Sequence, residues 1–180
     1  YGWSMTQLAK LVKNWYGGAD LSKLHDLTAA ALAGEVPAKL AATEDWTPPE
    51  DVLVIVPHCW FPITAAAEKA DQDRIPLFGW KDDGWLDMPN EASMDPTEPV
   101  KQFLAWKKAG FHIRKVGHDR KFARKYYQAM KKAGFSVVDQ PQMYLQKSEG
   151  FRYIEHKAKV GCLYYCHAEP YEYCVANVRA

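Results

Sequence analysis

The fold of this chain is decided by one stretch, Asp51-Val52-Leu53-Val54-Ile55-Val56-Pro57-His58-Cys59-Trp60-Phe61-Pro62. Its run of β-branched and apolar residues predicts a buried strand. Upstream, residues 15–22 have the character of a strand that ends in a polar turn. Residues 27–36 are apolar and rich in alanine, and their position between two strands favours a strand over a helix. Three strands with short connections predict a β-meander.

The segments around this meander alternate between helical and strand periodicity. Ser4 is a typical N-cap, and Met5, Leu8, Leu11 and Val12 follow it at helical spacing. Downstream, we predict helices over 64–73, 99–109, 120–133, 143–160 and 169–178, strands over 111–117, 135–138 and 162–166, and a loop over 75–96. Two αβ units after a meander make a mixed α/β sheet.

The composition is that of an ordinary globular domain, with 48% hydrophobic and 25% charged residues. No apolar run approaches the roughly 20 residues that a membrane-spanning helix needs. Charge is distributed unevenly, with 7 basic and 16 acidic residues in 1–100 but 15 basic and 4 acidic residues in 101–160. A basic half beside acidic clusters permits a nucleic-acid partner without establishing one, since a solvated helix face has the same composition.

Two aspartates follow predicted strands at points where sheet proteins place their sites. Asp20 ends the first strand, and Asp119 lies between the strand over 111–117 and a helix. If these strands are neighbours, both carboxylates project from one sheet edge, and two close carboxylates favour a hard divalent cation between them. Asp26 follows six residues after Asp20 and is a further candidate ligand. The alternative is that all three aspartates only form turns and helix caps.

Several short motifs occur in an order that resembles the large-terminase nuclease domain of tailed phages. Tyr16-Gly17-Gly18-Ala19-Asp20-Leu21-Ser22, followed by Asp26-Leu27-Thr28-Ala29, is similar to the family's G-x-D-L/M-S turn and D-L-T-A strand. Val116-Gly117-His118-Asp119-Arg120 resembles its second acidic motif. Residues 135–142 with Ser148 resemble the next strand, and residues 173–179 resemble the helix with the N-V signature.

This resemblance implies a ribonuclease H-like mixed sheet, with three antiparallel strands followed by two parallel αβ units. It implies a Mg²⁺- or Mn²⁺-dependent endonuclease that cuts concatemeric double-stranded DNA with two metals. Asp20 and Asp119 are then metal ligands and catalytic residues, and Asp26 is an auxiliary metal ligand. The implied partners are DNA and, in the full-length protein, an ATPase domain, the small terminase and the portal, in the cytoplasm of the bacterial host.

The resemblance also implies that the domain is C-terminally truncated. The family's third acid lies beyond the N-V segment, and no aspartate follows Asp139 in this chain. We therefore expect an incomplete site, with 1–14 as a leading helix or linker and 15–180 as a nuclease domain without its C-terminal end. The G-x-x-x-x-G-K-S/T loop of an ATPase motor is also missing from the sequence.

Basic residues around the second acid are candidates for contacts with the DNA backbone: Lys115, Arg120, Lys121, Arg124 and Lys125. His118 could orient a water molecule or contact a phosphate, but we predict that it is a surface histidine. Two alternatives stay open. One is another ribonuclease H-like nuclease of the transposase or resolvase type, and the other is a non-catalytic domain that binds DNA or a packaging partner.

Overall fold

The computed structural model describes residues 2–21, 27–90, 94–118, 124–139, 144–165 and 168–177. Its strands are β1 (Trp15–Asp20), β2 (Thr28–Val36), β3 (Val52–Trp60), β4 (Leu86–Asp87), β5 (Ile113–His118), β6 (Val137–Asp139) and β7 (Leu163–Tyr165). Its helices are α1 (Met5–Leu11), α2 (Ala38–Ala41), α3 (Ile63–Asp73), α4 (Leu77–Asp82), α5 (Glu98–Lys108), α6 (Arg124–Lys132), α7 (Tyr144–Lys159) and α8 (Glu169–Ala176). Within these ranges, no helix is long and apolar enough to cross a membrane.

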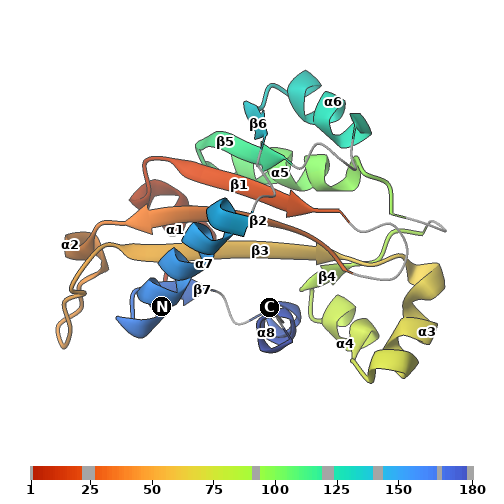
Figure 1. Ribbon diagram of the computed structural model, residues 1–180, viewed down its shortest axis with the longest axis horizontal. Helices are drawn as coiled ribbons and strands as arrows, with labels where there is room; N and C mark the ends of the chain where they lie inside the picture. Colours follow the sequence, from red (N-terminus) through yellow and green to blue (C-terminus); the bar gives the residue numbers. More distant parts are fainter. Residues whose placement is uncertain are drawn as a thin grey trace.

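All seven strands belong to one mixed sheet in the order β4-β3-β2-β1-β5-β6, with β7 also paired to β3 (Figure 1). β1, β2 and β3 are antiparallel to one another, whereas β5 is parallel to β1 and β6 is parallel to β5. The predicted meander and the two parallel additions to it are therefore confirmed.

The longest pairing in the sheet joins β2 to β3 from Thr28↔Trp60 to Val36↔Val52. Along β2, residues with buried side chains alternate with less buried ones, as expected for a strand that turns successive side chains to opposite faces. The strand predicted over residues 27–36 is therefore confirmed.

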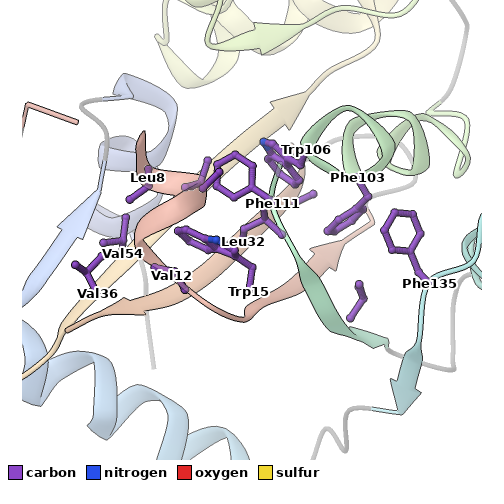
Figure 2. Close-up of a cluster of buried hydrophobic side chains, with 14 of the residues drawn as sticks. Leu8, Val12, Trp15, Leu32, Val36, Val54, Phe103, Trp106, Phe111 and Phe135 are labelled. Atoms are coloured by element: carbon purple, nitrogen blue, oxygen red, sulfur yellow. The ribbon is translucent and has the colours of Figure 1, made fainter. Parts of the chain in front are cut away.

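One face of the sheet, here called the core face, carries the main hydrophobic cluster, which includes Leu32, Val54, Val56 and Val116. Helices α1, α5 and α6 supply the other side of this cluster, and Figure 2 shows Phe103 and Trp106 of α5 reaching toward the sheet. The Trp15 ring packs edge-on against Phe111 with centroids 4.9 Å apart. Burial of large rings such as these removes apolar area from water and stabilises the domain.

The leading helix α1 begins where the sequence predicts. The Ser4 hydroxyl accepts from the Gln7 backbone N–H at 3.2 Å, and the Gln7 side chain accepts from the Ser4 N–H at 2.9 Å. This capping box satisfies two N–H groups that the first turn leaves open. Leu8 and Val12 lie in the same buried cluster as Trp15. The division of the chain between residues 14 and 15 stays a prediction.

The opposite face, here called the second face, carries a smaller cluster that includes Cys59, Leu77, Trp80 and Leu86. Helix α4 and strand β4 belong to it, so the prediction of a loop over 75–96 is wrong for these residues. The segment is ordered because Leu77 and Trp80, three residues apart, both turn inward from α4. The Trp80 indole N–H also donates to Glu169 of α8 at 2.8 Å.

Strand β7 was predicted as an element, but its place in the sheet was not. It runs parallel to β3, with Leu53↔Leu163 as its first pair. The helix before it, α7, is tied to the start of β3 because Lys157 donates to the Asp51 carbonyl at 2.6 Å. Figure 1 shows α7 crossing on the near side of the sheet.

Candidate functional site

The parallel pairing of β1 and β5 brings the carboxyl ends of both strands to one edge of the sheet. Their register runs from Trp15↔Ile113 to Gly18↔Gly117, with an irregularity after Trp15. Asp20, the last residue of β1, is exposed and stands opposite Ala29 of β2. The sequence alone could not show whether the strands before Asp20 and Asp119 are neighbours. In the structure these strands, β1 and β5, pair directly. Carboxyl ends of parallel strands are where α/β sheets bind ligands.

Four of the predicted site residues lie outside the described residues: Asp26, Asp119, Arg120 and Lys121. The described part of β5 ends at His118, immediately before the second predicted acid. Asp20 is therefore the one predicted metal ligand whose position the structure describes.

Asp20 projects from the second face of the sheet. It shares a row with Ala29, Cys59 and Leu86, which all belong to the second-face cluster. Gly18, two residues earlier on the same side, has nothing within 4 Å of the position that a Cβ would occupy. Gly17, on the core face, would place a Cβ 2.6 Å from the Phe103 ring. On the core face the sheet is therefore tightly packed at Gly17, whereas on the second face no described residue approaches the Cβ position of Gly18.

His118 is buried, with 4% of its surface exposed, so the prediction of a surface histidine is wrong. Because it lies two residues after Val116 in β5, its side chain projects onto the same core face. There its ring lies near Tyr126 and Tyr127 of α6, with centroids 5.7 and 5.1 Å away. The burial of a histidine at the end of a strand is hard to predict from sequence because it depends on whether a helix covers that side of the strand.

The predicted basic residues that the structure describes lie on two sides of the sheet. Lys115 is in register with Tyr16 and alternates with buried Val116, so it projects from the second face. Arg124 and Lys125 are exposed on α6, which packs on the core face through Tyr126 and Met130. Any duplex that contacts all three side chains must therefore pass over the edge of the sheet.

Sequence reasoning missed one carboxylate at this edge. Asp139 ends β6 and is the register partner of His118, so it shares the core face rather than the face of Asp20. Like Asp20, Asp139 is an aspartate at the carboxyl end of a parallel strand. It was missed because the sequence does not show which strand β6 pairs with. Among the described residues, no group of three or more His, Cys, Asp or Glu side chains is arranged to hold a metal ion.

Comparisons with known proteins agree with the motif resemblance. No family model matches the chain. The class that the sequence comparison indicates is that of terminase large subunits. Its match is the large terminase subunit of Enterobacteria phage HK97, 32% identical over 83 residues, which are 46% of this chain and 14% of that protein.

The crystal structure of the HK97 bacteriophage large terminase has the same fold, with a TM-score of 0.70 and 24% identity over 86% of this chain. The match covers 30% of the terminase chain, so this chain spans under a third of the relative in both comparisons. The resemblance to the large-terminase family that the motifs predicted is confirmed.

Proposed function

We propose that this chain is the metal-dependent DNA-cleaving domain of a phage packaging terminase, of the ribonuclease H-like kind, which cuts concatemeric double-stranded DNA. The observation that carries the proposal is the parallel pairing of β1 and β5, with Asp20 at the end of β1. The sequence and fold similarity to the HK97 large terminase supports it. In the complete protein we expect an ATPase domain, the small terminase and the portal as partners, in the cytoplasm of the bacterial host.

The residues at the sheet edge suit Mg²⁺ or Mn²⁺. Asp20 offers a carboxylate, the hard oxygen donor that these ions prefer, and it is exposed at the end of β1. Asp119 is the second proposed ligand and Asp26 an auxiliary one. A pair of ions about 3.5–4 Å apart would activate water and stabilise the leaving oxygen of the phosphodiester.

The remaining role of the chain is to hold the DNA against this edge. Lys115, Arg124 and Lys125, with Arg120 and Lys121, supply positive charge for the phosphate backbone. Because Lys115 and α6 lie on opposite faces, we propose that the duplex passes over the edge where Asp20 stands.

The test is cleavage of plasmid DNA by the full polypeptide that contains these residues, with Mg²⁺, with Mn²⁺ and with EDTA. Asp20→Asn should lower the cleavage rate about 100-fold or more, the scale expected when a metal ligand is lost, while DNA affinity is retained. Asp71→Asn, an exposed carboxylate on α3, is the matched control and should cleave at the wild-type rate.

A second candidate function is DNA binding without cleavage. The observation that favours it is the charge of α6, which carries Arg124, Lys125, Lys131 and Lys132 and no acidic residue. This candidate requires DNA binding without metal-dependent nicking in the wild-type protein, and an Asp20→Asn variant that behaves like the wild type. The same experiment therefore separates the two functions.

A further inference from the structure

The carboxyl end of β5 and one side of α6 border an open polar hollow of about 420 Å³ on the core face of the sheet. Its described lining residues are His118, Arg124, Tyr127 and Gln128. The hollow and Asp20 lie on opposite faces of the sheet but at the same edge. His118, which lines the hollow, directly precedes Asp119 in the sequence. A volume of this size is within the range of small-ligand pockets and has room for a phosphate with its sugar.

The spacing of residues on α6 explains why this hollow is polar. Tyr126 and Met130, four residues apart, point into the core and are almost fully buried. Arg124, Tyr127, Gln128 and Lys131 follow the i, i+3, i+4, i+7 spacing of a second stripe, and the first three line the hollow. The Lys131 ammonium lies 4.9 Å from the centre of the Tyr127 ring, so the fourth member adds positive charge beside the hollow. This stripe of α6 therefore lines the hollow with positive charge, and α6 carries no acidic residue that would neutralise it.

The donors in the hollow match a phosphodiester. A guanidinium presents N–H groups in a fork that fits two phosphate oxygens, and the Gln128 amide adds an uncharged donor. The His118 ring is buried and lies tilted against the Tyr126 and Tyr127 rings, so packing restrains this wall of the hollow. Asp139, the register partner of His118, is not among the described residues that line the hollow.

We propose that this hollow is a binding subsite for a backbone phosphate of the DNA substrate, displaced along the strand from the phosphate that is cut. The inference rests on the proposed nuclease function and deepens it. Arg124 pairs with the phosphate, Gln128 donates a hydrogen bond to it, and the His118 and Tyr127 rings form the wall. Anchoring the strand on the core face fixes where it crosses the sheet edge toward Asp20.

The test measures binding of a short DNA duplex to the full polypeptide in EDTA, across a range of salt concentrations. Arg124→Gln should weaken binding about tenfold and make the salt dependence shallower by about one phosphate contact. Gln128→Leu, which removes an uncharged donor, should weaken binding several-fold at an unchanged salt slope. Lys108→Gln on α5 loses one exposed charge away from the hollow and is the control, with a change under about twofold.

Three outcomes would contradict the proposed subsite. It is overturned if Arg124→Gln and Lys108→Gln weaken binding equally, if Gln128→Leu has no effect, or if the wild type does not bind the duplex. Inorganic phosphate and a deoxynucleoside monophosphate serve as competitors, and tight binding of either would assign the hollow to a free ligand instead of DNA. The binding test is done in EDTA and does not depend on the metal site. A negative result would therefore overturn the subsite alone, and loss of cleavage in Asp20→Asn would still support the nuclease function.

Discussion

The Lys157 ammonium lies 3.0 Å from the Glu50 carboxylate and donates at 2.6 Å to the carbonyl of Asp51. These contacts join the end of α7 to the residues just before β3. The Lys157 side chain is only 6% exposed, so both contacts are shielded from water on the lysine side. The helix that precedes β7 is therefore tied to the start of β3 by a buried cation.

Replacing this cation should destabilise the domain. Lys157→Met keeps the apolar stem but leaves the Asp51 carbonyl without this donor and leaves Glu50 with His156 alone, so the free energy of unfolding should fall by about 1–3 kcal/mol. Lys159→Met removes an exposed i,i+4 pair with Glu155, which solvent screens, so it should change stability little. Urea denaturation measures the free energy of unfolding of both variants. Equal losses would show that the buried contacts of Lys157 stabilise the domain no more than the exposed pair does.

The stability contribution of Glu50 should depend on pH. Hydrogen bonds from His156 and Lys157 hold the pKa of the Glu50 carboxyl below its ordinary value. A lowered folded-state pKa stabilises the fold above the unfolded value of about 4.3, and this contribution is lost as pH falls through the folded pKa. The melting temperature of the wild type should exceed that of Glu50→Gln at pH 6, and the gap should close on acidification. A gap that stays constant to pH 3 would contradict this assignment.

Two glycines in neighbouring strands should respond differently to the same change. A Cβ on Gly34 would lie 2.7 Å from both the Trp15 ring and a Val12 methyl, so Gly34→Ala should cost about 1–3 kcal/mol through overpacking. A Cβ on Gly18 meets nothing within 4 Å, so Gly18→Ala should be neutral or stabilise by up to about 1 kcal/mol. Chemical denaturation of the two variants tests the packing, and a Gly18→Ala variant that is as unstable as Gly34→Ala would show that the second face is covered there.

The sequence predicted the meander, the parallel strands and the leading helix because their apolar residues follow clear periods. The run Val52–Val56 and the alternation along β2 leave little choice of element. The sequence could not predict that β7 pairs with β3. Strand pairing depends on contacts between distant segments, and the three residues of β7 are too few to specify a partner. The burial of His118 was missed for a related reason, because it depends on Tyr126 and Tyr127 from a separate helix.

Tyr126 carries a buried hydroxyl with no hydrogen-bond partner among the described residues. Burial raises the pKa of this phenol well above its usual range. Tyr126→Phe removes an unsatisfied polar atom without changing the ring, so it should leave stability unchanged or raise it by about 0.5–1 kcal/mol. Thermal unfolding is the measurement, and a clear loss of stability would mean that the hydroxyl is bonded in solution.

The most direct test of the metal-dependent nuclease is a crystal structure of the complete protein grown with Mn²⁺, with the ion located by its anomalous scattering. We predict Mn²⁺ within about 2.0–2.3 Å of carboxylate oxygens from both Asp20 and Asp119, at the edge where β1 and β5 end. Asp20 and Asp119 carboxylates more than about 8 Å apart on different faces, with no ion between them, would contradict the account.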